Sequence, residues 1–156
     1  MTTISHSSQS PARILIVDDE TPARRRLRDL LDDCREQFPL TIADEAANGV
    51  EAIEIINRES VDIVLTDIRM PVMDGLEVAC HVAKMDAPPK IIFVTAFDQY
   101  AVKAFELNAI DYLLKPIRLE RLACAASAIA AAIAGLRAMA LLSAISRRSS
   151  RIGFNR

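Results

Sequence analysis

Residues 61–75 read VDIVLTDIRMPVMDG, and this stretch decides the fold. Its apolar run, residues 63–66, is continuous rather than alternating, which is typical of a parallel strand covered by helices on both faces. Asp67 follows the run directly, and Asp74 followed by Glu77 resembles the capping box at the start of a helix. The stretch therefore predicts a central strand, a loop that begins with a carboxylate, and a helix.

Four more short apolar runs flank this one, with helix-start signals between them. Thr21 before Pro22, Asn48 followed by Glu51, and Asp98 are each expected to cap a helix. The second run is weak, as expected for an edge strand. The five predicted strands are residues 14–17, 41–43, 63–66, 91–95 and 110–114. The order βαβαβαβαβα with short connections predicts an α/β fold with a doubly wound, five-stranded parallel sheet.

The composition is that of one soluble globular domain with some length left over. Of 156 residues, 51% are hydrophobic and 26% are charged, which is ordinary for globular proteins. Three cysteines far apart in the chain predict neither a disulfide framework nor a metal site, and a reduced cytoplasm fits them best. The first residues, MTTISHSSQS, have no basic start and no apolar run, so residues 1–11 are expected to be a disordered leader rather than a signal peptide.

The C-terminal part combines an alanine-rich helix with a basic tail. The last eleven residues contain four arginines and no acid, leaving 15 basic and 21 acidic residues elsewhere. We interpret this end as a solvated tail and expect no DNA binding from it. Residues 119–145 are apolar enough to suggest a membrane helix, but the content is mostly alanine and includes Arg137, so we expect no membrane span.

The alanine-rich helix carries an apolar stripe with two interpretations. It either packs on the sheet and runs past it, or it pairs with a second chain as in a coiled coil. The residues of the stripe are Leu122, Ala126, Ile129, Ile133, Leu136 and Ala140.

Polar residues follow four of the five predicted strands or close them. Because the carboxyl ends of parallel strands meet at one edge of the sheet, Asp18, Asp19, Asp67, Thr95 and Lys115 are expected to lie together. Three carboxylates so close together repel unless they share a cation, and oxygen ligands without cysteine or histidine indicate Mg²⁺. Carboxylates, Mg²⁺, an ammonium and a hydroxyl describe a phosphoryl-transfer site. Asp67, on the central strand, is the candidate nucleophile.

Four motifs together resemble those of response-regulator receiver domains, the CheY-like superfamily. They are LIVDDE, LTDIRMPVMDG, FVTA and YLLKP, and the resemblance covers residues 12–130. It implies the flavodoxin-like (βα)5 fold and a phosphoacceptor role for Asp67. It also implies direct Mg²⁺ contact for Asp19, contact mainly through water for Asp18, and a further ligand in the backbone carbonyl of Arg69.

The same resemblance implies a conformational switch. Lys115 would pair with the phosphoryl group, and the Lys115–Pro116 bond would be cis. Thr95 would move toward the phosphoryl oxygens, with Ala96 leaving room, and Tyr112 would then rotate inward. The alternative for Tyr112 is a side chain packed permanently in the core.

The segment TAFDQYAVKAFELNAIDYLLKPI is similar to receivers of the LytR/AlgR group, whose members carry a LytTR-type DNA-binding domain after the receiver. Only 26 residues follow residue 130, so we expect that domain to be missing or truncated, with a helical extension and basic tail over residues 131–156. An alternative is that the chain is a fragment of a LytTR-type transcription regulator.

The resemblance implies a sensor histidine kinase as partner and no enzymatic activity beyond self-phosphorylation and self-dephosphorylation. We also expect a homodimer that phosphorylation strengthens, through the face formed by residues 98–107, 110–114 and the last helix. A haloacid-dehalogenase-like phosphatase is disfavoured, because its nucleophile lies on the first strand with an aspartate two residues later, where this chain has Arg69. Histidine-kinase activity is excluded, because neither His6 nor His81 lies near a nucleotide motif.

Overall fold

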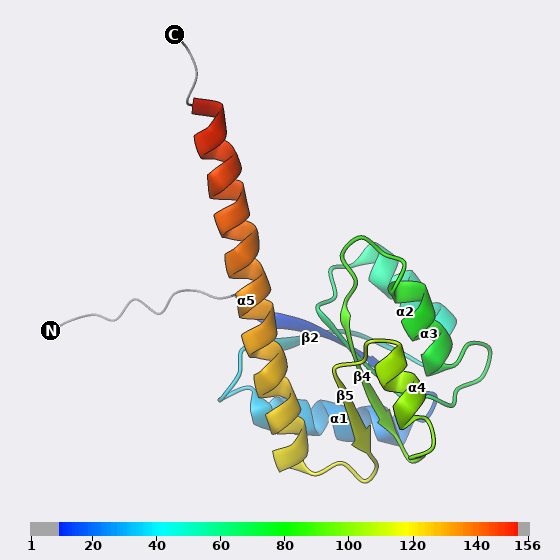
Figure 1. Ribbon diagram of the computed structural model, residues 1–156. Helices are drawn as coiled ribbons and strands as arrows, with labels where there is room; N and C mark the ends of the chain where they lie inside the picture. The colour runs from blue at the N-terminus through cyan, green and yellow to red at the C-terminus, as the bar shows by residue number, and fades with distance from the viewer. Residues whose placement is uncertain (1–9, 153–156) are drawn as a thin grey trace, which may run out of the picture.

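A computed structural model describes residues 10–152, which form five strands and five helices in alternation (Figure 1). The strands are β1 (Ala12–Val17), β2 (Leu40–Ala46), β3 (Ile63–Thr66), β4 (Lys90–Thr95) and β5 (Asp111–Leu114). The helices are α1 (Thr21–Cys34), α2 (Gly49–Arg58), α3 (Gly75–Val82), α4 (Ala101–Glu106) and α5 (Leu119–Ile152). Most of the predicted leader, residues 1–9, and the end of the tail, residues 153–156, lie outside the described residues.

All five strands are parallel, in the order β2-β1-β3-β4-β5. The predicted α/β class and doubly wound sheet are therefore confirmed, and β2 is an edge strand as expected. From β1 the chain passes first to β2 on one side and then to β3 on the other. Ligands of such sheets bind at this switch point, outside the carboxyl ends of the two strands.

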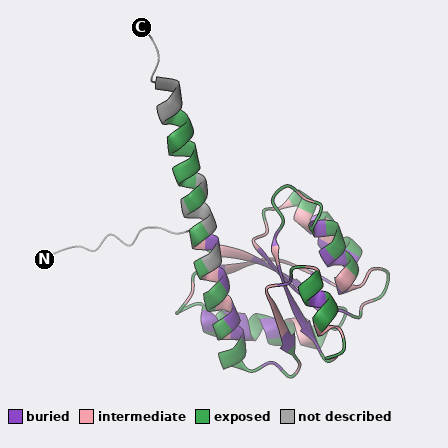
Figure 2. Cartoon of the chain, in the orientation of Figure 1, coloured by how far each residue is buried: buried purple, intermediate pink, exposed green. Residues whose placement is uncertain are grey.

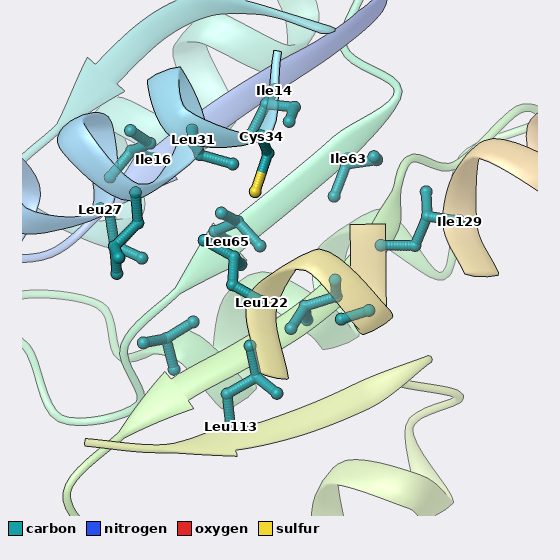
Figure 3. Packing of buried hydrophobic residues seen from close by; sticks show 14 of the residues in the cluster. Ile14, Ile16, Leu27, Leu31, Cys34, Ile63, Leu65, Leu113, Leu122 and Ile129 are labelled. Atoms are coloured by element: carbon teal, nitrogen blue, oxygen red, sulfur yellow. The ribbon is translucent and has the colours of Figure 1, made fainter. Parts of the chain in front are cut away.

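The sheet separates two apolar cores because successive strand residues point to opposite faces. Ile14 and Ile16 of β1 face α1 and α5, and Leu15 and Val17 face α2, α3 and α4. Figure 3 shows the first core, in which side chains from α1 and α5 meet those of the central strands. Both faces are covered, which explains why the strands read as continuous apolar runs.

Helix α5 packs on the sheet with its first half only. Leu122, Ala125, Ile129 and Ile133 are buried in the core shared with α1, so the first interpretation of the stripe, a helix packed on the sheet and running past it, describes this half. Figures 1 and 2 show the helix continuing outward, with its far part exposed.

Beyond Ile133, the large exposed apolar residues among the described side chains lie at positions other than those of the predicted stripe. They are Met139, Leu141, Leu142 and Ile145. At about 100° per residue, Leu142 lies on the opposite side of the helix from Ile133. The side chains of Leu136 and Ala140 lie outside what the structure describes. The outer part of the predicted stripe, and its pairing with a second chain, therefore stay predictions.

The helix starts differ in detail from the expected caps. Helix α1 begins at Thr21 itself, so Glu20 is its N-cap and makes no side-chain capping bond. Helix α4 begins at Ala101 after Tyr100, and Asp98 contributes only its backbone carbonyl, to the Ala101 N–H. In both cases a strand-to-helix loop, rather than a capping side chain, sets where the helix starts.

The other two caps follow the sequence more closely. Asp74 and Glu77 form the complete capping box of α3. At α2 the Asn48 side chain accepts the Glu51 N–H as expected, but the Glu51 carboxylate accepts from Ala47 rather than from Asn48.

No helix within residues 10–152 is long and apolar enough to cross a membrane.

Candidate functional site

Three aspartates meet at the carboxyl ends of β1 and β3. Asp18 and Asp19 follow β1, Asp67 follows β3, and one carboxylate oxygen of each lies within 4.8 Å of the others. Asp18 is fully buried, Asp67 is 9% exposed and Asp19 is exposed. The pairing of β1 with β3 brings the two strand ends together, as predicted. The cluster is thus reached from solvent past Asp19 and Asp67.

Lys115, which follows β5, binds two of these carboxylates. Its Nζ donates to Asp18 Oδ2 at 2.7 Å and to Asp67 Oδ2 at 2.8 Å. Burial alone lowers the pKa of this ammonium, but the hydrogen bonds and the negative charges of Asp18 and Asp67 together outweigh burial and raise the pKa above its usual 10.5. Burial raises the pKa of Asp18 despite the hydrogen bond from Lys115. When all four groups are ionised, the cluster keeps an excess of two negative charges.

Backbone N–H groups hold the remaining carboxylate oxygens. Asp18 Oδ1 accepts from the Glu20 N–H at 2.9 Å, and Asp67 Oδ1 accepts from the Ile68 N–H at 2.6 Å. Each carboxylate therefore has one oxygen on the backbone and one on Lys115. These bonds hold both carboxylates in fixed orientations, and each oxygen keeps a further lone pair that can accept a cation.

The loop from Ile68 to Gly75 is folded tightly against the end of β3. The Gly75 N–H donates to the Ile68 carbonyl at 2.7 Å. A Cβ on Gly75 would lie 2.1 Å from the Asp67 carbonyl oxygen, so only glycine fits. Val72 has a φ of 71°, a strained value for a β-branched residue. The loop that carries Arg69 is therefore held in one compact shape, and the role of the Arg69 carbonyl as a ligand stays a prediction.

Thr95 and Tyr112 lie on the neighbouring strands β4 and β5. Thr95 is buried, and its Oγ1 accepts the Phe97 N–H at 3.4 Å, while Ala96 is exposed. Tyr112 is half-buried, and its hydroxyl donates to the Phe97 carbonyl. Burial raises the pKa of Tyr112. Both residues thus contact Phe97, and neither interpretation of Tyr112 is decided by this arrangement.

The Lys115–Pro116 peptide bond is cis, as the sequence resemblance implies. The Lys115 N–H donates to the Thr95 carbonyl at 2.8 Å. Lys115 and Thr95 are therefore neighbours at the carboxyl end of the β4–β5 pair.

Comparison with known proteins supports the resemblance to receiver domains that the sequence motifs indicate. The family described as the response regulator receiver domain matches residues 14–127. This chain belongs to that family. Its curated relatives include the positive alginate biosynthesis regulatory protein of Pseudomonas aeruginosa, 49% identical over 113 residues, which cover 70% of this chain and 44% of the relative. The sensory transduction protein LytR of Staphylococcus haemolyticus is 47% identical over 110 residues, covering 70% of this chain and 42% of that protein.

The receiver domain therefore spans less than half the length of these relatives, and both fit the predicted LytR/AlgR grouping. Among solved structures, the CheX-CheY-BeF3-Mg complex from Borrelia burgdorferi is similar, with a TM-score of 0.68 and 27% identity. The match covers 77% of this chain and 90% of that one. The flavodoxin-like receiver fold is thus confirmed.

Two side chains at the site of this receiver domain were missed by sequence analysis. Arg24 Nη1 donates to the Asp18 carbonyl at 2.7 Å, and the Tyr100 hydroxyl accepts from Arg69 Nε at 3.1 Å. Arg24 is one of three consecutive arginines, so no local signal distinguishes it. Tyr100 lies in the motif-poor loop after β4, and only the tertiary structure brings it to Arg69.

Proposed function

We propose that this receiver domain accepts a phosphoryl group on Asp67 in a Mg²⁺-dependent reaction, with a sensor histidine kinase as donor, and signals by changing conformation. The observation that carries the proposal is the Asp67 carboxylate, bound by Lys115 at 2.8 Å and lying within 4.8 Å of Asp18 and Asp19. No turnover beyond self-phosphorylation and self-dephosphorylation is proposed.

The residues present fit Mg²⁺. The cluster offers only hard oxygen ligands, it carries more negative charge than Lys115 neutralises, and its open side leaves room for waters that Mg²⁺ retains. By the family resemblance, Asp19, Asp67 and the Arg69 carbonyl would hold the ion directly and Asp18 through water. When bound, Mg²⁺ would neutralise charge that develops on the phosphoryl oxygens.

The chain's own groups position the reaction. An Asp67 oxygen attacks phosphorus and forms the acyl-phosphate bond, while the bond from phosphorus to the donor breaks and its electron pair leaves with the donor. The Ile68 N–H holds the other Asp67 oxygen and so orients the attacking one. Lys115, already beside Asp67, supplies positive charge to the phosphoryl oxygens, and the Thr95 hydroxyl donates to them after it moves.

Labelling with acetyl phosphate and Mg²⁺ tests the assignment. Intact-mass analysis should show one added phosphoryl group on the parent and none on Asp67→Asn, which keeps the shape but removes the nucleophile. The matched control is Asp86→Asn, which removes an exposed carboxylate in the α3–β4 connection and should leave labelling unchanged. Full labelling of the Asp67→Asn variant would disprove the assignment.

We also propose a homodimer that phosphorylation strengthens. Helix α4, β5 and the start of α5 expose large apolar side chains next to the strands that carry Thr95 and Tyr112. They are Val102, Phe105, Leu114 and Leu119. A change at Asp67 has a short route to this face, with a coupling of about 1–3 kcal/mol. The exposed apolar residues of the far half of α5 offer a second, phosphorylation-independent contact.

Sedimentation with and without beryllofluoride separates the two contacts. Phe105→Ser should abolish the beryllofluoride-dependent increase in dimer, and Leu142→Ser should reduce the dimer equally in both conditions. A parent protein that stays monomeric at tens of micromolar in both conditions would refute the dimer.

The boundaries proposed for the parts are 12–130 for the receiver and 131–156 for the extension and tail. The proposed location is the cytoplasm, which keeps the three cysteines reduced.

A LytTR-type DNA-binding output is the second candidate function, because the relatives are about twice as long as the matched region. No described residue supports DNA binding by this chain itself.

A further inference from the structure

Arg69 joins the loop from Ile68 to Gly75, called here the acceptor loop, to the loop between β4 and α4. Its Nε donates to the Tyr100 hydroxyl at 3.1 Å, and its guanidinium carbon lies 4.9 Å from the centre of the Phe97 ring. The Phe97 and Tyr100 rings meet edge-to-face with centres 6.3 Å apart. A planar guanidinium suits both contacts at once, because it stacks on one ring and donates in its own plane to the hydroxyl on the other.

These contacts involve the segment that must move if Thr95 moves. Tyr100 is the N-cap residue of α4, and Phe97 lies between Thr95 and that helix. The Phe97 N–H already donates to Thr95 Oγ1 and the Phe97 carbonyl accepts from Tyr112. Phe97 is therefore contacted by Thr95, Tyr112 and Arg69, and a shift of the Thr95 hydroxyl has to break or rearrange this set.

Arg69 is also a cation whose described partners, the Tyr100 hydroxyl and the Phe97 ring, are neutral groups. It is exposed, and within the described part of the chain it forms no ion pair with a carboxylate. Its position, two residues after Asp67, puts it on the loop that carries the acceptor. Guanidinium binds phosphoryl oxygens more strongly than it binds a neutral hydroxyl, because the acceptor is charged and two N–H groups can engage it.

We propose that Arg69 is a positioning residue that latches the β4–α4 loop to the acceptor loop in the unphosphorylated protein. A phosphoryl group on Asp67 competes for the guanidinium, which leaves Tyr100 and frees Phe97, Thr95 and the start of α4 to rearrange. The inference rests on the proposed phosphorylation of Asp67 and adds to it the group that restrains the switch before the reaction.

The chain contains only two tyrosines, Tyr100 and Tyr112, so 3-fluorotyrosine labelling gives two ¹⁹F signals that Tyr100→Phe assigns. Tyr112 remains in every variant and reports on the loop through its bond to the Phe97 carbonyl. The titration is beryllofluoride with Mg²⁺ on the full chain, followed by the Tyr112 signal in the parent, Tyr100→Phe, Arg69→Met and the double variant.

Tyr100→Phe removes the hydroxyl that accepts from Arg69 and keeps the ring, so it should lower the beryllofluoride midpoint about two- to tenfold. In the Arg69→Met background the same change should have no effect, because the latch is already open. In the free protein, Arg69→Met should shift the Tyr100 signal. Arg121→Met, which removes an equal charge from the exposed pair with Asp111, should not.

A midpoint that Tyr100→Phe leaves unchanged or raises overturns the latch, and so does an equal shift in both backgrounds. If acetyl phosphate labels Asp67 and the parent responds to beryllofluoride while the variants fail these tests, only the latch is wrong. If the parent neither labels nor responds, the proposed function fails and the latch fails with it.

Discussion

Replacing Asp19 by asparagine should stabilise the metal-free protein. Asp19 is exposed, it makes no ion pair within residues 10–152, and it lies within 4.8 Å of the Asp18 and Asp67 carboxylates. Lys115 binds those two carboxylates, so the three groups together carry one net negative charge facing Asp19. The substitution removes a repelled charge and breaks no described ion pair.

The expected gain follows from Coulomb's law. One like charge at 4.8 Å costs about 0.9 kcal/mol in a water-like dielectric, which is the appropriate limit for an exposed carboxylate. Salt at about 0.1 M screens part of this repulsion. We expect the free energy of unfolding to rise by about 0.5–1 kcal/mol, which is a Tm increase of about 1–4 °C.

The assay is a thermal melt in EDTA at low and high salt, with Asp86→Asn as the matched loss of an exposed carboxylate. The gain should shrink at high salt and should be absent in the control variant. An Asp19→Asn protein that melts lower than the parent in EDTA would show that repulsion is not what Asp19 contributes.

Magnesium should reverse the order of stability. At 100 times the Kd, Mg²⁺ adds about 2.7 kcal/mol to the parent. If the variant binds about thirtyfold more weakly, the same concentration adds only about 0.9 kcal/mol. The parent should then melt higher than Asp19→Asn. Identical Mg²⁺ shifts for the two proteins would exclude Asp19 as a ligand.

Two further predictions concern the same edge of the sheet. Gly75→Ala should cost about 2–4 kcal/mol, because its Cβ would lie 2.1 Å from the Asp67 carbonyl. In Gly135→Ala the new Cβ would have nothing within 4 Å, so this control should be neutral or should stabilise the fold by up to about 1 kcal/mol. Equal urea midpoints for the two variants would contradict the argument from the close approach at Gly75. Burial raises the pKa of Asp18, so the folded protein holds the proton of this carboxyl more tightly than the unfolded chain does. The resulting stability is present below the ordinary pKa of 3.8 and is lost as pH rises through the folded pKa. In EDTA the stability of the parent relative to Asp18→Asn should therefore fall with rising pH, and a difference that grows with pH in urea titrations would contradict this sign.

The sequence by itself determined the order of elements, the parallel sheet and the edge on which the site lies. Each of these follows from local features. Residues 63–66 are continuously apolar because β3 is covered on both faces, and a parallel strand needs a helical crossover before the next one. Asp18, Asp67 and Lys115 could be placed together because each directly follows a strand, whatever the details of packing.

The tertiary structure decided the features that depend on contacts between distant residues. Arg24 on the Asp18 carbonyl and Tyr100 on Arg69 leave no local pattern, because each contact is made by one side chain that the fold brings near. Helix α5 shows the same limit. Its composition predicts a long helix, but the last buried residue among its described side chains, Ile133, depends on where the sheet and α1 end beneath it. Spacing along a helix specifies which residues share a face, and only the packed sheet specifies how much of that face is covered.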